Sequence, residues 1–301
     1  MKVYSWNDVL TAAPIGPSAI TIGGFDGMHL GHQALFDAVF EWKERRVKEA
    51  APRLGLAKDS GFAASLGLAS NSSSAPRLGL ASNSVLTGAV TFRRPAGALM
   101  NPRYAGDIFT EKFKLEFLEK RGFDFCVMID FSENFSKMEG RNFLDKLRKF
   151  CSMQFLAAGS DFRLGHNSDT GVAELSDYAT QNGLELKVLD DVLLDGKRVS
   201  SSLIRKAVQE GDFALAKKLL GRPFRIDGSP FTWRACSSES GLTLIANEKA
   251  TQVLPKAEGF SVGVVFDGKK SSAFFYAEDQ FLRLEFPLGQ KVSKIQEIEF
   301  L

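Results

Sequence analysis

Short apolar runs rich in β-branched residues alternate, along the first 220 residues, with longer stretches in which apolar side chains recur every three or four positions. The short runs are typical of buried strands, and the periodic stretches are typical of helices that cover them. Strands are predicted at 19–23, 86–92, 123–130, 154–158 and 184–189, and helices at 32–48, 111–120, 138–150, 172–181, 202–210 and 213–219. Such alternation favours an α/β fold, in which helices cover both faces of a parallel sheet.

The pattern changes after Pro223, where short strands without intervening helices are predicted at 261–266, 272–276 and 280–286. The first connector contains Asp267-Gly268, a pair that favours a tight hairpin turn. We therefore expect an α/β domain at 1–222, followed by a small β-rich module at 223–301.

Residues 50–84 interrupt the first domain with a repeat. Leu-Gly-Leu-Ala recurs at Leu54, Leu66 and Leu78, and the residues between the units are mostly glycine, serine, asparagine and alanine. So few bulky side chains cannot bury a shared core. A functional lid and a duplication tolerated at the surface are both compatible with the pattern, and the composition favours an exposed surface loop.

Composition excludes several classes of partner. The formal net charge of +2 gives no electrostatic reason to expect nucleic acid or an acidic membrane surface as a partner. No run approaches the roughly 18 apolar residues of a membrane-spanning helix. The first residues lack the apolar stretch of a signal peptide, and three scattered cysteines form neither a disulfide framework nor a metal-ligand pair. A cytoplasmic protein is expected.

The segment 20–33 carries the most specific chemistry. A strand runs into the turn Gly23-Gly24-Phe25-Asp26-Gly27, and His29 and His32 follow at the start of a helix, with Gly31 between them. Glycines let backbone N–H groups approach a ligand, and a helix start adds unpaired N–H groups and a positive dipole end. Two surface histidines are the alternative, but only three histidines occur in the chain and two lie here. A polyphosphate site is therefore favoured.

A second helix start carries hydroxyls and a cation. Ser200, Ser201 and Ser202 can cap this helix or donate to phosphate, and Arg205 lies on its first turn. An ordinary serine cap beside a solvated arginine explains the same residues.

Five ordered elements resemble one family. The run Gly24-Phe25-Asp26-Gly27-Met28-His29-Leu30-Gly31-His32 contains the H-x-G-H element of nucleotidyltransferases in the form typical of prokaryotic FAD synthetases. Four further elements are similar to motifs of that family and follow in the same order: Val90-Thr91-Phe92, Gly159-Ser160-Asp161-Phe162-Arg163-Leu164-Gly165, Val199-Ser200-Ser201-Ser202-Leu203-Ile204-Arg205 and Gly221-Arg222-Pro223-Phe224. Apart from the insertion, the resemblance covers about residues 1–228.

The resemblance implies a Rossmann-like domain that transfers AMP from ATP to FMN with Mg²⁺, giving FAD and pyrophosphate. It implies that ATP and FMN are the small-molecule partners, and the sequence leaves the oligomeric state open. Catalytic roles are implied for His29, His32 and Arg205, and ATP contacts for Gly23, Gly24, Phe25, Asp26, Gly31, Ser200, Ser201 and Ser202.

On the flavin side, FMN contacts are assigned to Asp161, Phe162, Arg93 and Arg94, with Asp161 also the candidate metal ligand. Some of these residues have a second interpretation. Asp26 either places Mg²⁺ or braces its loop, and bracing is slightly favoured. Phe162 either packs on the flavin or in the core, and the two arginines either bind phosphate or solvate a loop. His166, in a polar loop, is expected at the surface.

Two departures from the family pattern matter. The segment after the second strand reads Phe92-Arg93-Arg94-Pro95 where the family has P-H-P, and no Pro-Thr dipeptide exists for the kinase motif G-x-P-T-x-N. We therefore expect FMN adenylyltransferase activity without riboflavin kinase activity. The alternatives are an adenylyl- or cytidylyltransferase of the same superfamily that acts on pantetheine phosphate or nicotinate mononucleotide, and a flavin-nucleotide sensor or carrier. Intact His29, His32, Ser202 and Arg205 favour chemistry.

Overall fold

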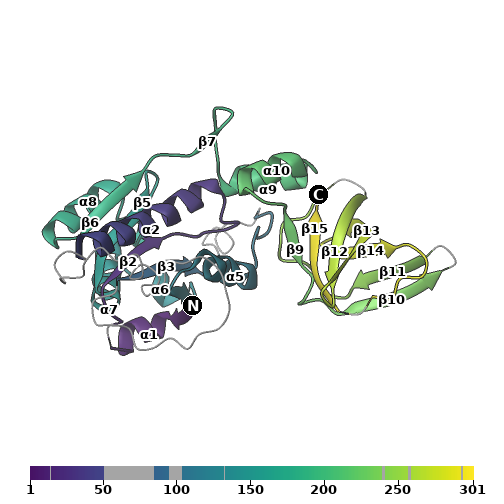
Figure 1. Cartoon of the computed structure of the whole chain (residues 1–301), viewed down its shortest axis with the longest axis horizontal. Coiled ribbons are helices and arrows are strands. Elements are labelled where there is room, and N and C mark those ends of the chain that lie inside the picture. Colours follow the sequence, from purple (N-terminus) through teal and green to yellow (C-terminus); the bar gives the residue numbers. More distant parts are fainter. Residues whose placement is uncertain are drawn as a thin grey trace, which may run out of the picture.

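The computed structural model describes residues 1–13, 15–50, 85–94, 104–131, 133–238, 241–256, 259–292 and 294–301. The repeat predicted as a surface loop therefore lies, apart from Ala50, outside the described residues. Two sheets dominate the described part of the chain, and helices α9 (Ser201–Gln209) and α10 (Phe213–Leu220) lie at the boundary between them (Figure 1).

The first sheet has six strands, all parallel, in the order β1-β4-β3-β2-β5-β6. Its central strand β2 is buried over its whole length, as expected when helices cover both faces. The strands are β1 (Lys2–Ser5), β2 (Ser18–Ile22), β3 (Leu86–Phe92), β4 (Phe125–Ile129), β5 (Met153–Gly159) and β6 (Glu185–Leu189).

Side chains of each strand alternate between the two faces. In β4, Cys126 and Met128 face one core cluster, whereas Phe125, Val127 and Ile129 face the other. Helices α2 (Leu30–Ala50) and α5 (Glu111–Arg121) cover the first face, and α1 (Trp6–Thr11), α7 (Gly140–Cys151) and α8 (Val172–Gln181) cover the second. The remaining helical turns are α6 (Glu133–Ser136) and η2 (His166–Ser168).

The strand order reverses at β2. From β2 the chain adds β3 and β4 on one side, and β5 and β6 on the other. In sheets of this type, ligands bind in the crevice beyond the carboxyl ends of the strands at such a reversal. The loop that follows β2 begins at this point and carries His29, with His32 just beyond it in the first turn of α2. The loop that follows β5 begins here too.

The second sheet is antiparallel and has seven strands in the order β10-β11-β14-β13-β12-β15-β9. Asp267-Gly268 turns β12 into β13 with both residues at positive φ, as a two-residue hairpin requires. The strands are β9 (Arg225–Asp227), β10 (Trp233–Ser238), β11 (Gly241–Ala246), β12 (Phe260–Phe266), β13 (Lys269–Glu278), β14 (Phe281–Phe286) and β15 (Ile295–Phe300). A small hairpin, β7 (Leu193–Leu194) with β8 (Lys197–Arg198), precedes α9.

One hydrophobic core runs from the α2 face of the first sheet into the second sheet. Aromatic rings bridge the boundary: Phe213 of α10 stacks on Phe300 of β15, with ring centroids 4.2 Å apart, and Phe224 lies 5.6 Å from Phe300. The two sheets are therefore packed together through α10 rather than joined only by the chain.

The predicted α/β architecture with a β-rich C-terminal module is confirmed, and each predicted strand and helix is found within a few residues. The sequence pattern missed ten short elements of the described part of the chain: β1, α1, α6, η2, β7, β8, β9, β10, β11 and β15. These elements have ten residues or fewer, and β1 lies at the edge of its sheet with mostly exposed side chains, so little periodicity marks it.

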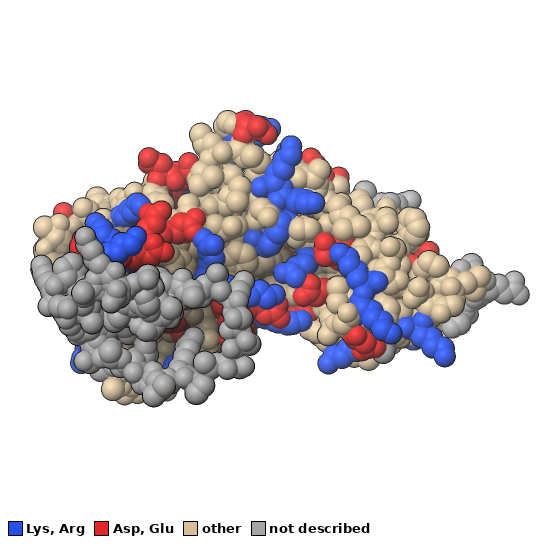
Figure 2. Space-filling view, viewed as in Figure 1, with Lys and Arg blue, Asp and Glu red and all other residues tan. Residues whose placement is uncertain are grey.

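Charges on the surface are mixed in sign. On the face drawn in Figure 2, Lys and Arg side chains lie interspersed with Asp and Glu. No helix among the described residues is both long and apolar enough to cross a bilayer.

Candidate active site

The loop between β2 and α2 has a strained backbone. Phe25 and Met28 have φ of 45° and 42°, and Gly27 has φ of 77°. A non-glycine residue in this region costs of order 1–3 kcal/mol, and such strain gathers at functional sites. Gly27 is also packed closely, because a Cβ there would lie 2.8 Å from Cγ2 of Ile108. The surrounding structure must therefore hold this loop in shape.

His29 and His32 stack against each other at the start of α2. Their ring centroids are 3.7 Å apart with the planes inclined at 16°, and Phe25 packs edge-on against His32. Gly31 makes the arrangement possible, because a Cβ at that position would lie 3.2 Å from the ring of His29. The spacing of the H-x-G-H motif thus brings both imidazoles to one place.

Both imidazoles are neutral at physiological pH. Burial lowers the pKa of His29 to about 4, assisted by the charges of Arg198 and Arg222. Burial and the neighbouring His29 lower the pKa of His32 well below its usual range. The backbone N–H of His32 donates to Nδ1 of His29 at 3.4 Å, which leaves the proton of neutral His29 on Nε2. Nδ1 of His32 is buried and has no hydrogen-bond partner among the described residues.

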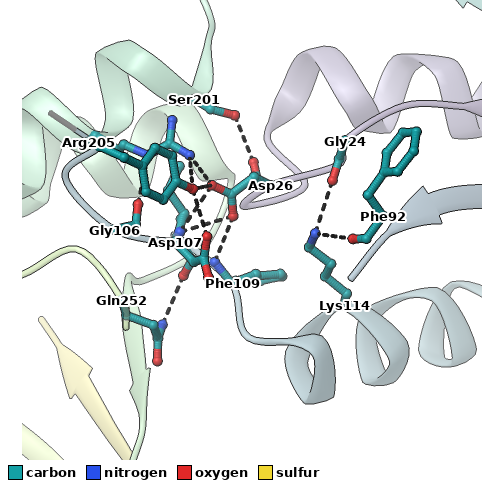
Figure 3. Close-up of polar contacts among 12 residues, drawn as sticks. Gly24, Asp26, Phe92, Gly106, Asp107, Phe109, Lys114, Ser201, Arg205 and Gln252 are labelled. Atoms are coloured by element: carbon teal, nitrogen blue, oxygen red, sulfur yellow. Dashed lines mark hydrogen bonds and ion pairs between the residues drawn. The ribbon is translucent and has the colours of Figure 1, made fainter. Parts of the chain in front are cut away.

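Asp26 lies at the centre of a buried polar cluster (Figure 3). Its Oδ1 accepts from the backbone N–H groups of Ile108 and Phe109, both at 3.0 Å, and its carboxylate forms an ion pair with Arg205. Burial raises the pKa of Asp26, while Arg205 and Lys114 oppose that effect. The carboxylate is committed to these partners, so the geometry matches the bracing interpretation rather than the placing of Mg²⁺.

Arg205 thus binds the loop between β2 and α2 through Asp26. Its Nε donates to the carbonyl of Gly106 at 2.8 Å, its Nη2 contacts both Asp26 and the hydroxyl of Tyr104, and its guanidinium lies over the Tyr104 ring. The alternative of a solvated arginine does not hold, because only 14% of the Arg205 side chain is exposed.

The three serines before Arg205 have different surroundings. Ser200 caps α9 by accepting from the N–H of Leu203, and Ser201 donates to the backbone carbonyl of Asp26 at 2.9 Å. Ser202 is exposed. The start of α9 is thus fastened to the histidine-bearing loop through Ser201 and Arg205.

Lys114 and Thr91 were missed as site residues. Lys114 is fully buried in α5, and its Nζ donates to the carbonyls of Gly24 at 3.1 Å and Phe92 at 2.9 Å. The hydroxyl of Thr91 donates to the same Gly24 carbonyl. Burial lowers the pKa of Lys114, and Asp26 and Asp107 oppose this effect. The sequence contained one indication that Lys114 is buried: it lies four residues before the core residue Leu118 and so on the same face of α5.

Arg222 holds the other side of the loop. Its guanidinium donates to the carbonyls of Gly27, Met28 and Leu220, and it lies between the rings of Phe109 and Phe117 at 4.7 Å and 4.5 Å. Burial lowers the pKa of this guanidinium, which remains protonated at neutral pH. The motif Gly221-Arg222-Pro223-Phe224 thus contacts the loop through the hydrogen bonds of Arg222.

The residues assigned to FMN lie at the carboxyl ends of β3 and β5. Asp161 is exposed and pairs with Arg198 of β8, which also contacts Asp191 at 3.1 Å. Phe162 is 8% exposed and belongs to the core beneath α7 and α8, as its core-packing interpretation required. Arg93 is exposed and pairs with Asp130 and Glu111, and Arg94 is exposed beside it.

Few of the described side chains near the site could hold a metal ion. Within the described residues, no group of three or more His, Cys, Asp or Glu side chains could hold an ion. Magnesium bound with a nucleotide needs only one or two carboxylates, because phosphates and waters supply the other oxygens. Asp161 is exposed but pairs with Arg198, so it could take that limited role only by exchanging this partner for the ion. His166 is exposed, as expected for a surface residue.

A family model and curated relatives point to one family. The FAD synthetase family model matches residues 13–51 and 78–203. Bifunctional riboflavin kinase/FMN adenylyltransferases are 27% identical over 214 residues in Buchnera aphidicola (70% of this chain, 57% of that protein) and 26% over 229 residues in Escherichia coli K12 (76% and 62%). The match thus spans about three fifths of these relatives.

A solved structure shares the fold over the whole chain. A protein of Streptococcus pneumoniae described as a macrolide-efflux protein superposes with a TM-score of 0.70 at 18% identity, covering 100% of this chain and 89% of that one. At this identity the likeness concerns the fold alone. The family match covers more than half of the chain and includes the loop with both histidines, and the chain belongs to the FAD synthetase family.

Proposed function

We propose that this protein is an FMN adenylyltransferase, which transfers AMP from ATP to the phosphate of FMN and releases pyrophosphate. One observation carries the proposal. Two neutral histidines stack at the point where the strand order reverses, at the start of a helix and in a loop held by buried charges. Membership of the FAD synthetase family supports the choice of ATP and FMN as substrates.

The reaction forms one P–O bond and breaks another. An oxygen of the FMN phosphate attacks the α-phosphorus of ATP, and the bond from that phosphorus to the β-phosphate oxygen breaks as pyrophosphate leaves. Such transfers need in-line positioning and donors directed at developing negative charge. His29 and His32 supply neutral N–H donors to the phosphates, and the start of α2 adds backbone N–H groups.

Arg205 and Asp26 act in this scheme by shaping the loop. Their mutual ion pair, together with Lys114 and Arg222, fixes the peptide groups on which the histidines depend. Gly23, Gly24 and Phe25 line the ATP side, and the hydroxyls of Ser200, Ser201 and Ser202 mark the second helix start beside it.

The FMN phosphate is assigned to the cations at the neighbouring strand ends, Arg93 and Arg94 after β3 and Arg198 beside Asp161. Asp161 would hold Mg²⁺ that enters with ATP, and the ion would neutralise phosphate charge there. The C-terminal module is assigned no kinase chemistry, because its sequence lacks the Pro-Thr dipeptide of the kinase motif.

Purified protein incubated with ATP, Mg²⁺ and FMN tests the proposal. FAD and pyrophosphate should appear in equal amounts, measured by chromatography and by a coupled pyrophosphate assay. Pantetheine phosphate and nicotinate mononucleotide serve as competing acceptors in parallel reactions. FAD formation absent at micromolar enzyme, or a faster reaction with another acceptor, would falsify the proposal.

A further inference from the structure

The C-terminal sheet contacts the active-site loop through an intermediate segment. Residues 104–110, here called the bridging segment, precede α5 and lie between the loop after β2 and the second sheet. On the loop side, the N–H groups of Ile108 and Phe109 donate to Asp26, and the carbonyl of Gly106 accepts from Arg205. The bridging segment thus supports both partners of the central ion pair.

On its other side, the bridging segment is held by residues 251–253, here called the clamp. Asp107 donates its N–H to the carbonyl of Thr251 at 2.9 Å, and its carbonyl accepts from the N–H of Val253 at 2.8 Å. Between them, the side chain of Gln252 donates to the carbonyl of Ile108 at 2.9 Å. Figure 3 shows Gln252 reaching from the C-terminal module toward the residues around Asp26.

Gln252 also fastens the clamp to its own sheet. Only 2% of the residue is exposed. Its Oε1 accepts from the N–H of Asp227 in β9 at 2.8 Å, and its Nε2 donates to the carbonyl of Arg225 at 3.0 Å. One amide group therefore joins β9 of the second sheet to the bridging segment, and a buried side chain with three such bonds is costly to replace.

The fit of the two backbones is close and does not depend on the side chain of Gln252. Gly106 has φ of 113°, and a Cβ there would lie 2.6 Å from the backbone nitrogen of Val253. Only glycine allows this approach. A second connection runs beside it, because Asp227 accepts from Thr110 Oγ1 at 3.2 Å and from Lys112 Nζ at 3.1 Å. Thr110 caps α5, whose Lys114 holds Gly24.

We infer that the C-terminal sheet takes part in adenylyl transfer by holding the histidine-bearing loop in its strained shape, with Gln252 as the positioning residue. The clamp fixes the bridging segment, whose amides fix Asp26 and whose Gly106 carbonyl orients Arg205. The module also contacts the cap of α5 through Asp227, and Lys114 of α5 binds Gly24. It therefore acts on the loop at two points, Asp26 and Gly24. This role needs no kinase chemistry, and it rests on the proposed function.

The test compares Gln252→Leu with Leu244→Ala. Leucine keeps most of the volume and removes all three hydrogen bonds. Leu244 is a buried core residue of β11, a strand that pairs with β10 and β14, so its truncation weakens the module and removes none of the hydrogen bonds of Gln252. Hydrogen exchange of peptides covering residues 23–32 reports on the loop without any assay of activity. Kinetics of FAD formation report on the reaction.

Gln252→Leu should accelerate exchange in 23–32 and lower kcat by about tenfold, with the KM for ATP changed less than about threefold. Leu244→Ala should lower the thermal midpoint while leaving both readouts near wild type. Equal acceleration in both variants, or unchanged exchange or kcat in Gln252→Leu, would overturn the inference.

The test also holds if Gln252→Leu does not fold or if the wild-type protein makes no FAD. If Gln252→Leu does not fold, Gly106→Ala carries the same test, because it disturbs the contact between the bridging segment and the clamp from the other side. If the wild-type protein makes no FAD, the proposed function fails. Hydrogen exchange then still decides whether the clamp holds the loop.

Discussion

At the scale of single residues, the loop after β2 is held mostly by its carbonyl oxygens. Lys114 and Thr91 bind the carbonyl of Gly24, and Arg222 binds those of Gly27 and Met28. In a trans peptide the N–H of the following residue points away from the carbonyl. Fixing these carbonyls on the protein side therefore directs the N–H groups of Phe25, Met28 and His29 the opposite way, where a phosphate can accept from them.

The histidines should act mainly on the transition state. His29→Ala and His32→Ala should each lower kcat by about 10²-fold, with a smaller change in the KM for ATP, as for the loss of one preorganised donor. Steady-state kinetics of FAD formation measure both constants, and His166→Ala, at the exposed third histidine, is the matched control. An unchanged kcat with a raised KM would reassign the pair to ground-state binding.

Burial of His29 also makes stability depend on pH. Its pKa is about 4 in the folded protein and near 6.5 when unfolded, so between these values the unfolded chain binds more protons. The free energy of unfolding should therefore fall as the pH is lowered from about 7 to 4, by at most about 1.4 kcal/mol per pH unit for this group. It should fall less steeply in His29→Gln. Urea denaturation across this range measures both slopes, and equal slopes would contradict the assignment.

At the scale of elements, prediction from sequence succeeded where a pattern repeats. Buried strands such as β2 and β4 read as apolar runs, and α7 places Phe143, Leu147 and Phe150 on one face. The hairpin at Asp267-Gly268 followed from its turn residues. The two strands of the second hairpin were also predicted, but its turn was not identified, because Asp279 and Gln280 take positive φ without a glycine.

Within the site, the sequence motifs placed the loop before His29 and His32 at the carboxyl-end edge of the sheet, where the structure has it, and the structure adds that the start of α9 contacts this loop. They did not reveal that Arg205 pairs with Asp26, because that contact joins positions 179 residues apart. Lys114 and Gln252 were missed for the same reason. Neither belongs to a local motif, and their partners are backbone carbonyls and amides that only the folded chain brings near.

The end of α2 and the start of β3, which residues 51–84 join in the sequence, lie at the edge of the sheet remote from the site. α2 ends at Ala50 and β3 begins at Leu86, at the amino end of the strands, whereas the histidines lie at the carboxyl end. Replacing 51–84 with a Gly-Ser linker of about ten residues should leave kcat/KM for FMN nearly unchanged and alter stability by only about 1 kcal/mol, since each halving of a loop changes its closure cost by about 0.6 kcal/mol. Loss of more than about tenfold in activity, with circular dichroism unchanged, would favour the lid.

At the scale of the whole molecule, the two sheets share one core and a buried polar contact at residues 251–253. On the face drawn in Figure 2, Lys and Arg side chains lie among Asp and Glu side chains. The C-terminal module is thus built into the structure around the active site, although its sequence lacks the Pro-Thr dipeptide of the kinase motif.

Riboflavin should not be phosphorylated by this chain. The kinase motif places a threonine and an asparagine at metal and nucleotide, and no Pro-Thr dipeptide is present to start it. Incubation with riboflavin, ATP and Mg²⁺ should therefore yield neither FMN nor FAD, whereas the same preparation supplied with FMN should yield FAD. Any ATP-dependent FMN measured by chromatography would show that another segment of the chain supplies these groups.

The strand order of the parallel sheet also has a consequence during synthesis. β1, at residues 2–5, pairs with β4 at 125–129, so its neighbour does not exist until well over a hundred further residues have been translated. At roughly 5–20 residues per second, translating the chain from β1 to β4 takes between about 6 and 25 s. Throughout that time, residues 2–5 remain an unpaired strand at the ribosome, open to chaperones and to other nascent chains. Among the described strands, β1 is thus separated from its first partner by the longest stretch of chain.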